Sequence, residues 1–189
     1  MAGHYRKYFC NKKILFFTDI PPQDKTAIHI WVGDAKASHE ETLMYILKKY
    51  FNKQLPPLSK TPEGKPYFPD FPLHFNLSDT GGYLAIAFSW QSPVGIDIEQ
   101  IRPVDEMLSL IANYFSPKEQ AYVKAQDSLI RFWEIWNRKE AVCKALGVGL
   151  QNDLPFWDCS GENWILVHNV WVQSIQIAEG ISSAIAICK

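Results

Sequence analysis

The sequence contains no hydrophobic run that is long enough to cross a membrane. Its longest early apolar run, Ile14-Leu-Phe-Phe17, is also too short for the hydrophobic region of a secretory signal. We therefore expect a cytoplasmic protein that has no membrane partner. Residues 1–25 carry no motif that we can assign, and we expect them to form a charged, partly ordered N-terminal extension.

Cysteine clusters and an excess of one charge are absent as well. Cys10, Cys143, Cys159 and Cys188 are widely scattered and include no Cys-x-x-Cys pair. This indicates reduced thiols and argues against a disulfide framework or a zinc site. The formal net charge is −1 at pH 7, so no basic field indicates nucleic acid as a partner.

The chain is long and apolar enough to bury a sizeable core, since it has 189 residues, of which 47% are hydrophobic and 14% aromatic. Period-two and helical patterns alternate along it without low-complexity linkers. We expect strands near residues 26–32, 73–77, 83–89, 94–99, 164–168, 170–177 and 183–188, and helices near residues 38–51, 105–114, 117–124 and 129–146. A proline-rich turn region is expected at residues 55–72.

The second half of the chain repeats the kinds of element found in the first, which indicates an internal pseudo-repeat. We therefore expect an α+β protein with two similar lobes, residues 26–103 and 104–189.

Two acids lie close together in Val94-Gly-Ile-Asp-Ile-Glu99. Period-two alternation places Asp97 and Glu99 on one face of a strand, about 7 Å apart, where two anions repel each other by roughly 2 kcal/mol. A cation would relieve this repulsion, and ligands that offer only oxygen favour a hard ion such as Mg²⁺. The alternative is an edge strand whose acids simply face water.

The helix expected at residues 129–146 carries a third acid, Glu140. Helical spacing separates an apolar stripe from a face with two tryptophans, one acid and one lysine. The stripe comprises Phe132, Ile135, Val142 and Leu146, and the opposite face comprises Trp133, Trp136, Glu140 and Lys144.

A helix face with two tryptophans is rarely solvated, so we expect another segment to cover it or a cleft to lie beside it. The alternative is an ordinary surface pair of Glu140 and Lys144, one turn apart. If this helix faces the acidic strand, Glu140 completes a site of three carboxylates with Lys144 beside it. The helix should end at Leu146, before Gly147.

Six short motifs follow one another along the chain at compatible spacing. They are Gly64-Lys-Pro66, His74-Phe-Asn-Leu-Ser78, Val94-Gly-Ile-Asp-Ile-Glu99, Phe115-Ser-Pro-Lys-Glu119, Trp136-x-x-Lys-Glu-Ala-x-x-Lys144 and Gly147-Val-Gly-Leu150. Together they resemble the 4′-phosphopantetheinyl transferases. The likeness is to the larger, pseudodimeric class that activates peptide and polyketide synthases, the surfactin-synthetase-activator type, and not to the small trimeric class. It extends over roughly residues 26–189. The resemblance implies a monomer whose two lobes are related by pseudo-twofold symmetry, with the active site in the crevice between them.

The resemblance implies an enzyme that transfers the 4′-phosphopantetheine arm of coenzyme A to a serine of an apo acyl or peptidyl carrier protein. Adenosine 3′,5′-bisphosphate would be released. The resemblance also implies that Asp97, Glu99 and Glu140 hold Mg²⁺ or Mn²⁺ on the pyrophosphate, where the ion neutralises developing charge. Asp97 and Glu140 would thereby serve catalysis, and Glu140 could also accept the serine proton. Lys144 would stabilise or protonate the leaving phosphate.

The resemblance places Lys65, Ser78, Asp79 and Lys144 at the positions that contact coenzyme A. Lys65 and Ser78 would lie at its nucleotide end, which includes the 3′-phosphate. Each has an alternative interpretation from the sequence alone, Lys65 as a solvated loop lysine and Ser78 as a turn or cap residue.

Asp79 departs from the family pattern, which has a histidine that touches the 3′-phosphate at this position. An ionised aspartate cannot donate a hydrogen bond to a phosphate and would repel it. Three alternatives follow. Asp79 turns away and caps the following turn, leaving the phosphate to Lys65, Lys48 or Lys49; or coenzyme A binds weakly or in a dephosphorylated form; or the chain has lost activity and kept the fold. We favour the first because the three acids and Lys144 are all present.

Carrier docking is expected at residues 107–123, where Leu108, Ile111 and an exposed Phe115 are candidates by analogy with the family. Apolar residues at this spacing are, alternatively, core residues. Two rival functions also remain open. One is a non-catalytic module that binds coenzyme A or a carrier protein, and the other is a metal-dependent phosphohydrolase.

Overall fold

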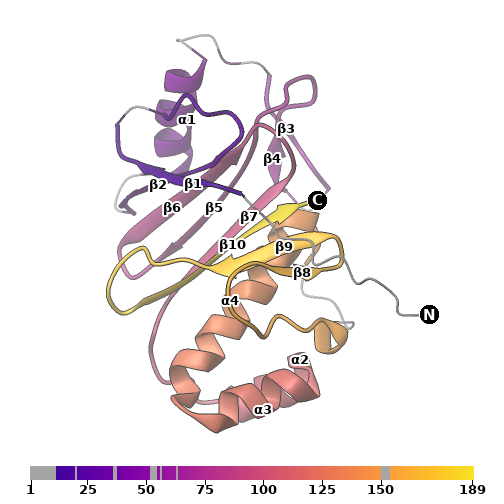
Figure 1. Cartoon of the computed structure of the whole chain (residues 1–189). Coiled ribbons are helices and arrows are strands. Elements are labelled where there is room, and N and C mark those ends of the chain that lie inside the picture. The colour runs from indigo at the N-terminus through magenta and orange to yellow at the C-terminus, as the bar shows by residue number, and fades with distance from the viewer. Residues whose placement is uncertain are drawn as a thin grey trace, which may run out of the picture.

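The computed structural model describes residues 12–19, 21–35, 38–51, 55, 57–62, 64–149 and 154–189. In this part of the chain, two four-stranded sheets lie side by side and a long helix packs against each (Figure 1). The mixed α+β class predicted from the sequence is confirmed. Cys10, Leu150 and residues 1–11 of the predicted N-terminal extension lie outside the described residues.

The first sheet has the strand order β1-β2-β6-β5. Its strands are β1 (Ile14–Phe17), β2 (Ile28–Asp34), β5 (His74–Thr80) and β6 (Tyr83–Ser89). Ser38 caps the start of helix α1 (His39–Tyr50), because its side chain accepts a hydrogen bond from the N–H of Glu41. The helix buries Leu43, Ile46 and Leu47 in the core beside this sheet.

Strand β1 was not expected from the sequence. Its four residues pair in parallel with β2, from Ile14 opposite Ile28 to Phe17 opposite Trp31. A run of four apolar residues is too short to distinguish a strand from part of a helix or loop by periodicity. Part of the predicted N-terminal extension is therefore an edge strand of the first sheet.

The second sheet has the strand order β7-β10-β9-β8. Its strands are β7 (Val94–Gln100), β8 (Ile165–Val167), β9 (Val170–Ser174) and β10 (Ile181–Cys188). All pairings in it are antiparallel. Strand β7 therefore belongs to the second sheet, although it precedes the boundary predicted at residues 103 and 104. The division into lobes and their pseudo-twofold symmetry stay predictions.

Helix α4 (Ser128–Leu146) packs on the second sheet and is buried along most of its length. Phe132, Ile135 and Val142 lie in the core, as the predicted apolar stripe requires. Leu146, by contrast, is 39% exposed. It is the last helical residue, and Gly147 turns the chain away with a φ of 74°, so that part of the predicted stripe is wrong.

Gly95 allows α4 to lie directly on β7. A Cβ atom at this position would overlap the carbonyl oxygen of Ala141 and the backbone nitrogen of Ala145. Only glycine permits this close approach of two backbones. The result is that the α4 turn with Glu140 and Lys144 lies against the strand that carries Asp97.

A buried ion pair joins two of the sequence motifs. Lys139 Nζ lies 2.9 Å from Glu119 Oε2, and both residues are almost fully buried. Lys139 Nζ also donates to the carbonyl oxygens of Leu154 and Trp157, at 2.8 and 2.6 Å. Glu119 Oε1 accepts from the N–H of Cys159 at 2.8 Å. Through these contacts, the ion pair links α3 (Pro117–Ala125) and α4 to the segment after residue 153.

The remaining elements are short. They are the two-stranded ribbon of β3 (Ser59–Lys60) and β4 (Pro66–Tyr67), helix α2 (Met107–Tyr114) and the 3₁₀ turn η1 (Leu154–Phe156). Helices α2 and α3 lie at the end of the molecule opposite to α1 (Figure 1). Among the described residues, no helix has both the length and the apolar character needed to span a bilayer.

Candidate active site

Asp97 lies where β5, β7 and α4 meet. It is 4% exposed, and its Oδ1 atom lies 2.7 Å from Nζ of Lys144. The hydroxyl of Ser78 donates a hydrogen bond to the same oxygen at 3.1 Å and accepts one from Lys144 Nζ at 3.1 Å. Three predicted site residues from three separate motifs are therefore in direct contact.

The second carboxylate oxygen of Asp97 is unpaired. Its Oδ2 atom is buried and has no hydrogen-bond partner among the described residues. An unsatisfied buried polar group costs on the order of 1–3 kcal/mol, and more when it is charged. A cation bound to this oxygen would remove that cost.

Glu99 and Glu140 interact electrostatically with Asp97. Burial, and secondly the negative charge of Asp97, raises the pKa of Glu140 to about 6. The same two causes raise the pKa of Glu99. The positive charge of Lys144 opposes both shifts, and that of Arg102 opposes the shift at Glu99. The contribution of Asp97 to both raised pKa values reflects repulsion between neighbouring negative charges, which a cation would relieve.

The three acids fit a hard divalent ion by chemistry, because they offer only carboxylate oxygens. As they stand, however, no three His, Cys, Asp or Glu side chains in the described ranges are grouped so that they could hold a metal ion together. Asp97, Glu99 and Glu140 therefore stay predicted ligands. Mg²⁺ commonly takes one or two carboxylates and completes its shell with waters and phosphate oxygens, which suits this arrangement.

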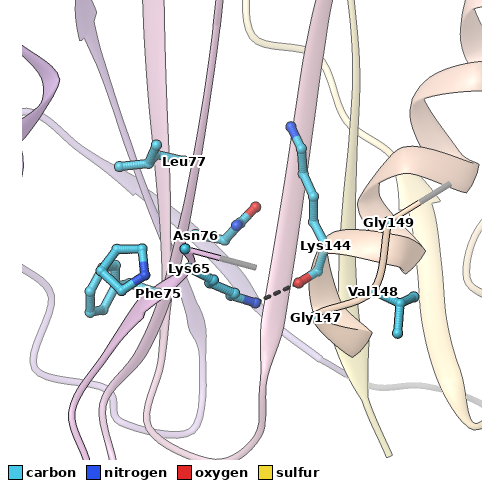
Figure 2. A pocket seen from close by; sticks show the side chains of 10 residues that line it. Lys65, Phe75, Asn76, Leu77, Lys144, Gly147, Val148 and Gly149 are labelled. Atoms are coloured by element: carbon cyan, nitrogen blue, oxygen red, sulfur yellow. Dashed lines mark hydrogen bonds between the residues drawn. The ribbon is translucent and has the colours of Figure 1, made fainter. Parts of the chain in front are cut away.

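A cavity of about 360 Å³ opens beside Lys144. Figure 2 shows Lys65 pointing across it toward the end of α4, where Nζ donates to the carbonyl oxygen of Lys144. Burial lowers the pKa of Lys65, and the positive charge of Lys144 lowers it further. Lys65 is thus a half-buried residue that caps a helix end, not a solvated loop lysine. The cavity is lined by Gly64, Lys65, Pro66, Phe75, Asn76, Leu77, Lys144, Gly147, Val148 and Gly149.

A second cavity, of about 390 Å³, lies on the other side of Gly64, Pro66 and Leu77, which line both cavities. Its polar lining includes His39, Lys60 and the acid Glu40, and Leu43, Met44 and Leu58 contribute apolar walls. The two cavities adjoin each other, and Lys144 of the acidic cluster lines the first.

Asp79 is half-exposed and faces His39 at the start of α1, with Oδ1 3.8 Å from the imidazole Nδ1. An imidazole is therefore present beside position 79, but it comes from a different element. Lys48 and Lys49, two of the lysines considered for the 3′-phosphate, lie in the last turn of α1. They are roughly 14 Å from His39 along the helix axis.

The three docking candidates on α2 and after it do not share one surface. Leu108 is 74% exposed, whereas Ile111 is 4% and Phe115 1% exposed. Phe115 stacks on Phe132 of α4 with ring centroids 5.5 Å apart. The predicted exposure of Phe115 is wrong because α2 and α3 pack their apolar side chains against α4. Only Leu108 of the three is available to a partner in this arrangement.

Sequence reasoning missed two residues that touch the site. Asn76 lines the first cavity, and the hydroxyl of Thr80 donates to Glu99 Oε2 at 3.3 Å. A signal for both was present, since Asn76, Ser78 and Thr80 alternate along β5 and so share one face. Trp133, on the helix face that was expected to be covered, is buried, and its indole N–H donates to the carbonyl oxygen of Arg102 at 2.9 Å.

Comparison with known proteins matches the segment that contains the three predicted metal ligands. Residues 93–175 match the family model described as the 4′-phosphopantetheinyl transferase superfamily. This range contains both acidic motifs and the motif around Glu119. It is shorter than the range of about 26–189 over which the sequence was expected to resemble the family.

Curated relatives share this similarity. The 4′-phosphopantetheinyl transferase AcpT of Salmonella typhimurium is 43% identical over 97 residues, which are 49% of this chain and 50% of the relative. The transferase gsp of Aneurinibacillus migulanus is 38% identical over 102 residues, 52% and 41% of the two chains. Sfp of Bacillus subtilis is 38% identical over 91 residues, which are 46% of this chain and 39% of the relative.

The aligned part spans half or less of the length of these relatives. Within it, the comparison confirms the resemblance read from the motifs. Residues 93–175, with Asp97, Glu99, Glu140 and Lys144, are similar in sequence to the 4′-phosphopantetheinyl transferase superfamily.

Proposed function

We propose that this protein transfers the 4′-phosphopantetheine arm of coenzyme A to a serine of an apo acyl or peptidyl carrier protein. The reaction depends on Mg²⁺ and releases adenosine 3′,5′-bisphosphate. The observation that carries the proposal is the buried Asp97 carboxylate, which has one oxygen on Lys144 and the other unpaired. It lies in the segment that matches the transferase superfamily. We further propose that the protein acts as a monomer in the cytoplasm.

Asp97, Glu99 and Glu140 hold the metal ion in this proposal. When bound, the ion neutralises charge on the pyrophosphate of coenzyme A and on the oxygens that gain charge during transfer. The unpaired Asp97 oxygen and the raised pKa values of the two glutamates support this role, because a cation would stabilise all three groups.

Glu140 and Lys144 handle the proton and the leaving group. The serine oxygen forms a bond to the phosphorus of the phosphopantetheine unit, and the bridging P–O bond to the nucleotide phosphate breaks. Glu140, whose pKa is raised to about 6, accepts the serine proton directly or through a water. Lys144 stabilises the phosphate that leaves as part of adenosine 3′,5′-bisphosphate.

Coenzyme A lies along the two adjoining cavities, with its pyrophosphate at Lys144 and Lys65. Lys60 and His39 in the second cavity meet the 3′-phosphate end. This placement differs from the first of the three alternatives for Asp79, because the carboxylate faces His39 instead of capping the following turn, and the phosphate is left to Lys60 and His39 instead of Lys65, Lys48 or Lys49. Asp79 then keeps His39 in place and does not itself contact coenzyme A.

The test is the intact mass of a panel of apo carrier proteins after incubation with the protein, coenzyme A and Mg²⁺. We expect a mass gain equal to one phosphopantetheine, which chelator abolishes and which Glu140→Ala lowers by at least about 100-fold. Running 3′-dephospho-coenzyme A as a second donor tests the account of Asp79. Clear preference for coenzyme A supports His39 and Lys60 as phosphate contacts, and equal use of both donors contradicts it.

The competing function is a module that binds coenzyme A or a carrier protein without chemistry. The feature that favours it is Asp79 at the position of the family histidine. Tight binding of coenzyme A, measured by calorimetry, together with no mass gain on any carrier would establish that function and refute transfer.

A further inference from the structure

Strand β5 is joined to β7 through side chains. Asn76, Ser78 and Thr80 lie on one face of β5, and each offers a side-chain oxygen to a backbone N–H of β7. Asn76 Oδ1 accepts from Ile96 at 2.9 Å, Ser78 Oγ from Ile98 at 3.3 Å, and Thr80 Oγ1 from Gln100 at 3.2 Å. These bonds fix the backbone of β7 between the two sheets, at the place where β7 carries its two acids.

Two of these three side chains also reach the acids themselves. Ser78 donates to Asp97 Oδ1 at 3.1 Å, and Thr80 donates to Glu99 Oε2 at 3.3 Å. Each hydroxyl therefore accepts from a backbone N–H and donates to the carboxylate of the preceding residue. Asn76 makes only the backbone contact, because position 95 is a glycine and offers no carboxylate.

The Ser78 hydroxyl has no bonding capacity left for a substrate. A hydroxyl has one hydrogen to donate and two lone pairs to accept with. The hydrogen goes to Asp97, and the lone pairs receive the N–H of Ile98 and the ammonium of Lys144. Ser78 is also buried. A contact with coenzyme A would have to displace one of these three bonds.

We propose that Ser78 and Thr80 are positioning residues, which hold the carboxylates of Asp97 and Glu99 in the orientation that receives a divalent cation, and that Ser78 does not contact coenzyme A. The inference rests on the proposed function, since it names what orients the ligands of its metal ion. Groups that hydrogen-bond to ligating carboxylates commonly change metal affinity by 10–100-fold when they are removed.

Ser78→Ala and Thr80→Val remove one hydroxyl each and keep the size of the side chain nearly unchanged. We expect the dissociation constant for Mn²⁺, measured on the protein alone by electron paramagnetic resonance, to rise by about 10–100-fold in each variant. Thr80→Ser retains a hydroxyl and should keep the affinity within about threefold of the original protein. At saturating Mn²⁺ the KM for coenzyme A of Ser78→Ala should stay within about twofold, because the hydroxyl does not contact it.

Asn76→Ala is the matched structural control. It removes the same kind of bond between β5 and β7 without touching a carboxylate, so it should lower Tm as the other variants do and leave Mn²⁺ affinity within about twofold. Unchanged Mn²⁺ affinity in Ser78→Ala and Thr80→Val would overturn the inference. A raised KM for coenzyme A in Ser78→Ala at saturating metal would overturn it as well, as would an equal loss of Mn²⁺ affinity in Asn76→Ala.

The outcome is separable from that of the proposed function. Mn²⁺ binding is measured without coenzyme A or carrier protein. If the hydroxyl variants lose Mn²⁺ affinity while the original protein modifies no carrier, the positioning role stands and the transferase function fails. If the original protein modifies carriers but the variants bind Mn²⁺ normally, the transferase function stands and the positioning role fails.

Discussion

The surroundings of Glu140 make the ionised form of its side chain unfavourable. Its pKa is raised from the ordinary value of 4.5 to about 6, by burial and then by the charge of Asp97. Because the pKa in the folded state lies above that in the unfolded state, ionisation of Glu140 costs stability. The penalty grows as pH rises from 4.5 through 6 and is complete above that window.

Glu140→Gln removes this penalty, and we expect it to stabilise the metal-free protein at pH 7.5. For a fully desolvated carboxylate, a pKa shift of this size corresponds to about 2 kcal/mol in the free energy of unfolding. Partial exposure to solvent reduces the gain to about 1 kcal/mol, or roughly 2–4 °C in Tm. Thermal unfolding at several pH values measures it, and the gain should shrink toward pH 5. A variant that is less stable than the original protein at pH 7.5, or equally stabilised at both pH values, would contradict this explanation.

The sequence predicted which residues form the site, but it did not predict most of the contacts between them. Alternation placed Asp97 and Glu99 on one strand face, and helical spacing placed Glu140 beside Lys144. Neither pattern says which side chain an acid meets on another element. The 2.7 Å contact of Lys144 with Asp97 and the unpaired Asp97 oxygen therefore emerge only from the three-dimensional arrangement.

At the scale of elements, the site depends on how closely α4 approaches β7. Gly95→Ala would place a methyl group on the backbone of Ala141 and Ala145, and backbone atoms cannot move aside as the end of a flexible side chain can. We expect a loss of about 3 kcal/mol, or roughly 6–12 °C in Tm. Because α4 carries Glu140 and Lys144, transfer activity should fall as well, even below the lowered Tm.

Gly149→Ala is the control for this prediction. A Cβ atom at Gly149 meets nothing within 4 Å, so Tm should change by only about 1–2 °C. Thermal unfolding by circular dichroism compares the two variants. Equal Tm values for Gly95→Ala and Gly149→Ala would show that α4 does not rest on β7 in the way described.

The long elements were predictable because their periodicity is strong. Helix α4 ends at Leu146, as the following glycine indicated, and β6 and β7 lie within a residue of their expected ranges. The four-residue β1 and the burial of Phe115 were not predictable. Both depend on a partner that is distant in sequence. Strand β1 forms by pairing with Ile28 to Trp31, and Phe115 is buried against Phe132 of α4.

At the scale of the whole molecule, residues from both sheets and from α4 meet at one point. Ser78 comes from the first sheet, Asp97 from the second and Lys144 from α4. Lys65 reaches from the loop before β4 to the last turn of α4. The sequence predicted that the site would lie between two parts of the chain, but it could not assign β7 to the second sheet. Pairing between β7 and β10 joins residues about 90 positions apart, which periodicity does not report.

The most direct test of the account is to count the adenosine 3′,5′-bisphosphate released per carrier molecule modified. Chromatography quantifies the nucleotide while intact mass quantifies the modified carrier in the same sample. A transferase predicts one nucleotide for each phosphopantetheine gained, and no nucleotide when the carrier or the divalent metal is left out. Release of nucleotide without a carrier would indicate a phosphohydrolase, and neither nucleotide nor mass gain on any carrier would contradict transfer altogether.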